Sequence, residues 1–72
     1  MKLTELKQGK TATISHVHLS GNIRQRVLDF GMVQHTPVTR LQTAPGGDPT
    51  AYMIRGTVIA LRKNDAEKIQ IN

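Results

Sequence analysis

Three histidines, His16, His18 and His35, are the only candidates in the chain for an iron or zinc site. Side chains two residues apart on a β-strand project to the same side, so His16 and His18 could form a two-histidine clamp. Stable metal sites usually need three or four ligands with supporting hydrogen bonds, and no carboxylate lies near this pair in the sequence. We therefore expect surface histidines and no resident cofactor, with weak binding of ferrous or another transition-metal ion as the alternative.

The remaining residue types do not supply a catalytic set. The chain has no cysteine, and its few His, Asp and Glu residues provide no combination of nucleophile, base and orienting group. Gly46-Gly47 lacks the Lys-Ser or Lys-Thr that would complete a phosphate-binding loop. A chain of this length buries only about 60% of its unfolded surface, which leaves little room for a deep active-site cavity. We expect a protein that is not an enzyme.

Charge and hydropathy restrict the neighbours of the chain. Ten Lys and Arg against five Asp and Glu give a net charge of +5, which favours an acidic protein face, an anionic membrane surface or nucleic acid. The basic residues are scattered from Lys2 to Lys68 and there are only two aromatic residues, which makes a poor nucleic-acid platform. The longest apolar run, from Val58 to Leu61, is too short for a membrane span or signal peptide. These features predict a single cytosolic domain over residues 1–72.

The stretch from Asn22 to Met32 predicts a helix, and the other elements are arranged around it. Ile23, Val27 and Phe30 fall at i, i+4 and i+7, which places them on one narrow helical stripe. We expect this stripe to be the buried face. Gly31 offers the left-handed position that commonly ends a helix.

The start and the flank of this helix are also informative. Asn22 and Gln25 have the spacing of a capping box. Leu28 lies off the buried stripe, and Arg24 lies between Leu28 and Val27 on the helical wheel. Either Leu28 widens the core face while Arg24 keeps its guanidinium in water, or this flank is where a partner binds.

A strand is expected over residues 10–19, after a single helical turn near the N-terminus that ends at a glycine. Within this strand Ile14 has one parity, whereas Val17 and Leu19 have the other. One inserted residue reconciles the two sets, so we predict a bulge near Ser15-His16 that leaves both histidines of the strand outward.

Four further short strands are expected after the helix, with tight connections between the middle ones. They cover residues 38–43, 50–55, 57–61 and 69–71. Pro37 can stand only at a strand start or edge, because it donates no hydrogen bond. Residues 57–61 are the most apolar, so we expect a central strand covered on both faces, and Asn64 with Glu67 predicts a capped helical turn before the last, edge strand.

This order of elements predicts a mainly β fold: a small five-stranded antiparallel barrel with one inserted helix. A barrel of this size fills its interior with side chains, so function is expected on loops, edges and the helix surface. Short edge strands that carry lysines favour a monomer or a weak oligomer.

Three blocks of sequence resemble one family. They are Arg26–Met32 (RVLDFGM), Ala44–Pro49 (APGGDP) and Ile59–Arg62 (IALR). At these spacings they resemble FeoA, the small cytosolic component of bacterial ferrous iron uptake, and the resemblance covers essentially the whole chain. It implies an SH3-like barrel, also found at the C-terminus of iron-dependent repressors. It further implies a non-enzymatic accessory protein that acts on FeoB, the membrane permease with a cytosolic GTP-binding domain.

The sequence departs from this family in two places. Gln34-His35 stands where Pro-Gly is common after the helix, which leaves the shape of that turn open. Arg40 stands where an apolar strand residue is usual, which indicates an exposed or edge strand.

The partner-facing residues that we expect are Arg24, Arg26 and Leu28 on the helix, with Pro45 and Asp48 in the loop. Arginine anchors framed by apolar groups dominate interface energetics. For the loop, a rigid hairpin turn is the favoured interpretation and a recognition loop the alternative. The predicted function is an adaptor that binds and modulates an FeoB-type permease and is peripheral to the membrane only through it. The alternatives are a small-barrel nucleic-acid or transcription-associated module, and a ferrous-ion carrier that uses the histidines.

Overall fold

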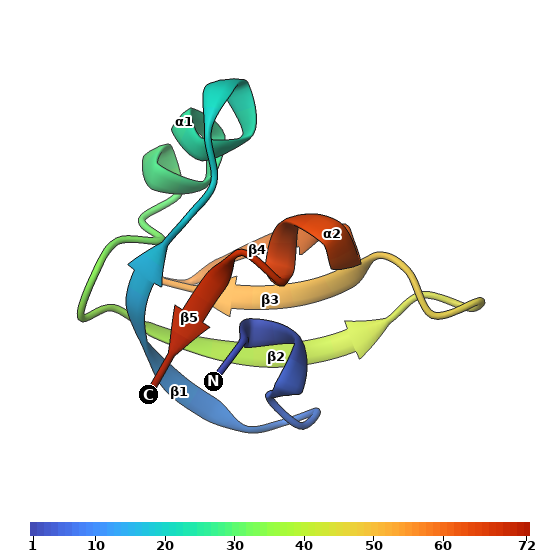
Figure 1. Cartoon of the computed structure of the whole chain (residues 1–72). Helices are drawn as coiled ribbons and strands as arrows, with labels where there is room; N and C mark the ends of the chain where they lie inside the picture. The colour runs from blue at the N-terminus through green and yellow to red at the C-terminus, as the bar shows by residue number, and fades with distance from the viewer.

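In the computed structural model, which describes residues 1–72, the chain folds around one antiparallel sheet (Figure 1). The elements in chain order are η1 (Leu3–Glu5), β1 (Thr11–Val17), α1 (Gly21–Asp29), β2 (Pro37–Thr43), β3 (Thr50–Ile54), β4 (Thr57–Leu61), α2 (Lys63–Ala66) and β5 (Ile69–Ile71). The strand order is β4-β3-β2-β1-β5, so β4 and β5 form the two edges and the sheet does not close. The predicted mainly β fold with five antiparallel strands is confirmed.

One hydrophobic core of fourteen buried side chains holds the sheet and helices together. Alternate residues of each strand supply most of it, as the period of two in a β-strand requires. Tyr52 and Ile54 of β3 share the inner face, as predicted, and Leu3 and Leu6 beside η1 are buried with them. None of the helices has both the length and the apolar character needed to traverse a lipid bilayer.

The predicted bulge in β1 is confirmed. The register of β1 against β5 shifts between Ile14 and His16. Ile14 and Leu19 are buried and Val17 is half-buried, whereas His16 and His18 are exposed. The extra residue therefore turns both parities of apolar residue inward, which is what a bulge does to a strand.

Helix α1 forms where it was predicted, but its buried face is different. Val27 is fully buried and Ile23 is half-buried, whereas Phe30 is 40% exposed. Phe30 is the C-cap, and Gly31 at φ +100° turns the chain away before the stripe continues. Met32, which lies beyond this turn, is fully buried in place of Phe30. The prediction that Phe30 is a core residue was therefore wrong.

The capping box predicted for α1 does not form. The N-cap is Ser20, two residues earlier than expected, so Asn22 lies inside the first turn. No side chain caps this end, and the Gln25 amide donates instead to Asp29 Oδ1 at 2.9 Å.

The capping box predicted for α2 is also wrong, because the cap comes from a distant loop. Arg62 is the N-cap residue, which places Asn64 within the helix. The main-chain N–H of Lys63 donates to Asp48 Oδ1 at 3.0 Å. A carboxylate at a helix N-terminus satisfies an otherwise free donor and interacts favourably with the helix dipole.

Strand β4 is an edge strand rather than the central strand that its composition predicted. Ile59 and Leu61 are buried, but Val58 is 55% exposed and Ala60 is also exposed. The apolar run was interpreted as burial on both faces. In the structure the outer face of β4 stays exposed at Val58 and Ala60, so only alternate residues enter the core.

Strand β2, in contrast, is an inner strand between β3 and β1, so the edge position indicated by Arg40 was wrong. The half-buried Arg40 is accommodated because its Nη1 donates to the carbonyls of Leu6 at 2.7 Å and Thr4 at 3.3 Å. Its Nη2 donates to the Thr43 hydroxyl at 3.1 Å. The guanidinium thus fastens the η1 turn to the sheet.

Strand β5 is the other edge, as predicted, and the N-terminal residues cover its outer side. The Ile71 N–H donates to the Met1 carbonyl at 2.8 Å, and Lys2 forms an isolated bridge with Gln70. Both ends of the chain therefore lie together at this edge (Figure 1).

Candidate functional site

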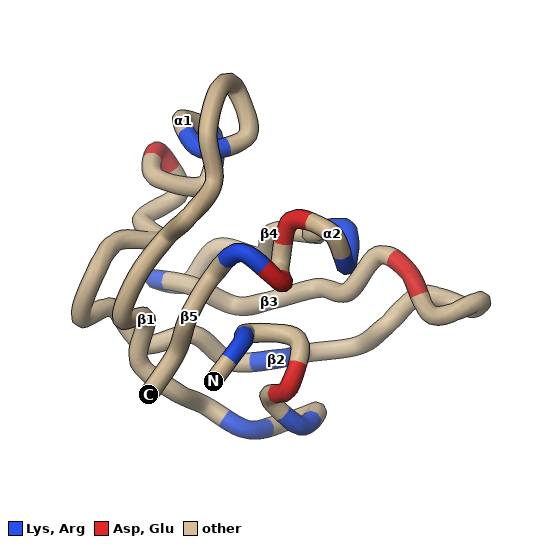
Figure 2. The backbone as a smooth tube through the Cα atoms, in the orientation of Figure 1, with Lys and Arg blue, Asp and Glu red and all other residues tan.

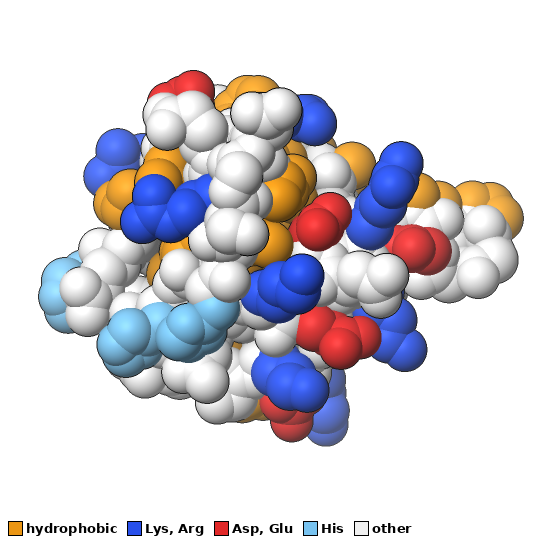
Figure 3. All heavy atoms as spheres, turned by 45° about the horizontal axis from the view of Figure 1, so that its top comes forward, with side chains coloured by type: hydrophobic (Ala, Val, Ile, Leu, Met, Phe, Trp, Pro, Cys, Tyr) orange, Lys and Arg blue, Asp and Glu red, His pale blue; other side chains and the backbone are white.

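The bulged strand brings two histidines together. The rings of His16 and His18 are stacked, with centroids 5.7 Å apart and planes 12° from parallel. Figure 3 shows two histidine side chains side by side and the third apart from them. No group of three His, Asp or Glu side chains in the chain converges as metal ligands would. The pair therefore offers two nitrogens and no third protein ligand.

His35 forms part of a turn rather than of the histidine pair. It follows α1 in the connector to β2 and adopts φ +73°, in the left-handed region that glycine normally fills. Its N–H donates to the Ile14 carbonyl at 2.7 Å. This exposed residue thus forms the turn at which the sequence departs from the common Pro-Gly.

The helix residues predicted to face a partner lie at the surface of α1. Arg24 and Arg26 are both exposed, and Leu28 is half-buried. Leu28 therefore lies at the margin of the core. This is intermediate between the two interpretations that the sequence left open, a core residue and a partner-binding residue. Figure 1 shows α1 standing off from the sheet, so most of its circumference faces outward.

A cleft that the sequence did not reveal lies between α1 and the edge strand β4. Its volume is about 360 Å³. The lining residues are Asn22, Ile23 and Arg26 from α1, Ile59, Ala60 and Leu61 from β4, and Arg62 and Asp65 beyond it. Arg26 is thus the predicted partner-facing residue that lines this cleft, whereas Pro45 lines a second hollow of about 310 Å³ between the β2–β3 loop and Ala60 of β4. One wall of the cleft is thus α1 and the other is β4, the edge strand that was expected to be central.

The loop residues lie elsewhere. Pro45 and Asp48 are exposed in the β2–β3 loop, and Asp48 caps α2. In Figure 1 this loop and α1 project from opposite ends of the molecule. The five predicted residues therefore do not form one continuous face.

A small polar pocket of about 250 Å³ adjoins that loop. Arg40, Tyr52 and Lys63 line it, together with Thr4, Gly47 and Thr50. Burial raises the pKa of Tyr52 above its ordinary value of 10.0, the charge of Arg40 acts against this rise, and Asp48 adds to it. The Arg40 Nε is buried without a hydrogen-bond partner, and every acceptor of this guanidinium is an uncharged oxygen.

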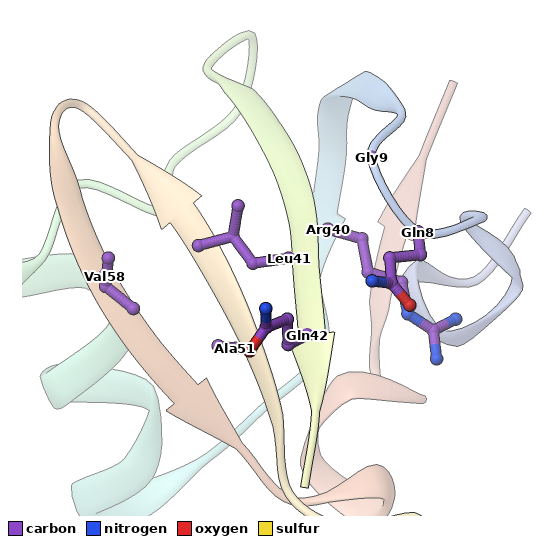
Figure 4. A pocket seen from close by; sticks show the side chains of 7 residues that line it. All are labelled: Gln8, Gly9, Arg40, Leu41, Gln42, Ala51 and Val58. Carbon is purple, nitrogen blue, oxygen red and sulfur yellow. The ribbon is translucent and has the colours of Figure 1, made fainter.

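The outer face of the sheet carries a shallow groove of about 470 Å³. Leu41, Ala51 and Val58 supply its apolar side chains from β2, β3 and β4 (Figure 4). The charged residues do not gather there. Figure 2 shows Lys and Arg on α1, on β2 and near both ends of the chain, with acidic residues among them. The basic residues are thus spread over several elements rather than confined to one.

Comparison with known proteins gives consistent matches over the whole chain. The sequence model of the FeoA domain family matches residues 1–72. The chain is 39% identical over 71 residues to an Fe(2+) transport protein A/Fe(2+) transporter FeoB fusion protein of Porphyromonas gingivalis. That match covers 99% of this chain but only 8% of the length of the fusion protein.

Among the solved structures that share the fold, two illustrate the range of similarity. FeoA of Chlorobium tepidum has a TM-score of 0.92 and 37% identity, with 99% of this chain and 68% of that chain covered. FeoA of Stenotrophomonas maltophilia, solved in complex with zinc and described as a prokaryotic SH3 domain protein, has a TM-score of 0.84 and 29% identity. That match covers 100% of this chain and 89% of the other. The SH3-like character predicted for the fold is thereby confirmed.

Proposed function

The chain belongs to the FeoA domain family, and from this membership we propose that it is a non-enzymatic adaptor of ferrous iron uptake. It binds the cytosolic part of an FeoB-type permease and modulates the assembly or GTP cycle of that permease. The observation that carries the proposal is the fusion protein of Porphyromonas gingivalis, in which a segment 39% identical to this chain is joined to the Fe(2+) transporter FeoB. Joining two domains in one polypeptide raises the effective concentration of each for the other, which favours even a weak contact.

The structure supports an adaptor through what it exposes. Helix α1 stands off from the sheet with Arg24 and Arg26 at its surface, and Arg26 lines the cleft beside β4. The Stenotrophomonas maltophilia relative is proposed, in its own description, to act as a bacterial ferrous iron transport activating factor. An accessory role of this kind needs a docking surface and no catalytic group.

The test is an NMR titration of ¹⁵N-labelled protein with the soluble GTP-binding domain of an FeoB-type permease, with and without nucleotide. We expect shifts on residues 24–32 or on residues 44–49. Leu28→Asp is expected to weaken binding more than tenfold, about 1.4 kcal/mol, while the chain stays folded. Loss of the fold would show instead that Leu28 belongs to the core.

Charge provides a matched control. Arg26→Glu and Lys10→Glu make the same change at two exposed positions, and only the first lines the cleft. We expect Arg26→Glu to weaken binding and Lys10→Glu to leave it nearly unchanged. Equal effects would mean that only net charge matters. Silence with the GTP-binding domain and salt-sensitive shifts with a short RNA would favour the nucleic-acid alternative.

For the histidine pair we propose weak metal binding at most. His16 and His18 supply two ligands, so a bound transition-metal ion would keep most of its coordination positions for water. Calorimetric titration with ferrous ion under anaerobic conditions is expected to give no heat at micromolar concentrations. A saturating isotherm there, abolished by His16→Ala, would support the ion-carrier alternative.

A further inference from the structure

The two edges of the sheet differ. Beyond β5, the chain's own N-terminus takes up the outward hydrogen bonds, since Ile71 donates to Met1 and Gln70 bridges Lys2. Beyond β4 no segment of the chain forms such bonds. The molecule thus has one closed edge and one open edge.

The open edge is unusually well suited to pairing. Natural edge strands are normally protected by charges, prolines or bulges, yet Thr57–Leu61 contains none of these. Its register with β3 is unbroken from the pair Ile54 and Thr57 to the pair Thr50 and Leu61. A strand with such a regular backbone can accept another strand along its whole length.

The antiparallel ladder determines which main-chain groups are free. Bonded and non-bonded pairs alternate along such a ladder, and a two-residue turn is closed by a bonded pair. Thr57 closes the turn, so Ile59 and Leu61 bond to β3, whereas the N–H and C=O of Val58 and Ala60 point away from it. No hydrogen bond outside the ladder involves either of these residues, and both are exposed.

Space for an added strand exists on both sides of this edge. Side chains of a strand paired with β4 would alternate between the outer face, beside Val58, and the cleft against α1. Figure 4 shows Val58 on the outermost strand of the sheet, beside the groove. The cleft on the other side has a volume of about 360 Å³ and is lined by Ile23 of α1.

Charge selects the occupant. The cleft contains two arginines, Arg26 and Arg62, against one carboxylate, Asp65. A second copy of this chain would bring the same arginines and a further net charge of +5 to the contact. An acidic segment would instead find complementary charge on the cleft side.

From these observations we propose that the open edge of β4 binds an extended, acidic segment of a partner protein by strand addition, with α1 as the wall of the groove. Main-chain bonds to Val58 and Ala60 hold the segment, and Arg26 and Arg62 select its acidic side chains. The proposal rests on the proposed function in one respect: the partner is taken to be the FeoB-type permease.

Amide hydrogen exchange tests the geometry directly. In the free protein the amides of Ile59 and Leu61 are expected to be protected and those of Val58 and Ala60 to exchange freely. On addition of the soluble GTP-binding domain, Val58 and Ala60 should become at least tenfold slower. If the domain binds without slowing these two amides, strand addition is overturned while the proposed function stands.

A proline variant provides the second arm. Ala60→Pro removes an outward N–H without breaking a bond to β3, as proline is tolerated at such edge positions. We expect it to weaken binding at least tenfold, whereas Ala60→Ser, which keeps the N–H, should bind like the wild type. Equal binding by both variants contradicts the proposal.

Peptides separate this proposal from the choice of partner. If the GTP-binding domain does not bind at all, a heptapeptide of alternating valine and glutamate is added to the labelled protein, with its valine and lysine counterpart as control. Slowed exchange at Val58 and Ala60 with the glutamate peptide alone supports the site even then. If neither peptide slows amide exchange at Val58 and Ala60, the proposal is overturned. It is also overturned if exchange at these amides slows simply as the protein concentration rises, because a second copy of the chain would then be the occupant.

Discussion

The half-buried Arg40 offers the sharpest test of how this small fold is held together. Replacing it by methionine keeps a long side chain of similar volume but removes the guanidinium. The Leu6 carbonyl then loses a short charge-assisted bond of 2.7 Å, and the Thr4 carbonyl loses a longer one of 3.3 Å. The η1 turn is thereby released from β2.

The expected magnitude follows from these bonds. Leaving a buried carbonyl without its donor costs about 1–3 kcal/mol, and the longer bond adds roughly 0.5 kcal/mol. The Thr43 hydroxyl keeps its hydrogen bond with the Thr50 hydroxyl, so losing the bond from Arg40 costs little there. The substitution also removes the buried, unpartnered Nε, which raises the free energy of unfolding by about 1 kcal/mol. We therefore expect Arg40→Met to lower the free energy of unfolding by about 1.5 kcal/mol, and the melting temperature by roughly 6–12 °C.

Urea unfolding followed by circular dichroism measures this loss. Arg24→Met makes the same chemical change at an exposed helix position and is expected to change stability by less than about 0.5 kcal/mol. Equal stability of Arg40→Met and the wild type would refute the reasoning, because it would mean that water replaces the guanidinium at no cost.

Three further predictions concern single contacts. Asp48→Ala removes the cap of α2 and is expected to cost about 1 kcal/mol in urea unfolding, whereas Pro45→Ala in the same loop should cost less. Gly31→Ala is expected to cost about 1–2 kcal/mol, since φ is +100° and the new Cβ would lie 2.7 Å from Arg55 Cδ; shortening Arg55 to alanine should relieve only part of this loss. The folded-state pKa of Tyr52 is raised above 10.0, so this side chain ionises in the unfolded chain before it does so in the folded protein. The contribution of Tyr52 to the free energy of unfolding should therefore be constant below about pH 9 and should fall as pH rises beyond about 10. Tyr52→Phe should remove that alkaline fall, and an unchanged fall would assign it to other groups.

The features predicted correctly from the sequence are those that depend on neighbouring residues. The parity change between Ile14 and Val17 determines the bulge, because one face of the strand must be buried. Pro37 begins β2, and Arg55 and Gly56 form the tight reversal between β3 and β4 with positive φ at both positions. Each of these follows from local backbone chemistry, so no knowledge of distant contacts was needed.

The features that were missed depend on contacts between distant segments. Periodicity placed Phe30 on the buried stripe, but the helix ends one residue before it. Composition cannot distinguish a strand covered on both faces from an edge strand, so β4 was placed at the centre. An inner strand accommodates Arg40 because main-chain carbonyls 36 and 34 residues away in the sequence accept hydrogen bonds from its guanidinium.

The candidate functional sites likewise divide into one that depends on neighbouring residues and one that depends on distant segments. The histidine pair was found because a separation of two residues is local, and the rings are indeed adjacent. The cleft was not found, because its two walls come from α1 and from β4 and only the fold brings them together. A surface built from segments that are far apart in the sequence cannot be predicted from the pattern of neighbouring residues.

The blocks that carried the family resemblance bear on where a partner binds. Asp48 in the loop block caps α2, and Ile59 and Leu61 in the strand block fill the core, so folding alone accounts for these residues. Folding does not account in the same way for Arg26 and Arg62, which are exposed and belong to the helix block and the strand block. Both line the cleft between α1 and β4. Arg26 and Arg62, from two different blocks, therefore meet at the cleft beside β4 that the strand-addition proposal uses, whereas the exposed Phe30 of the helix block and Pro45 of the loop block do not line it.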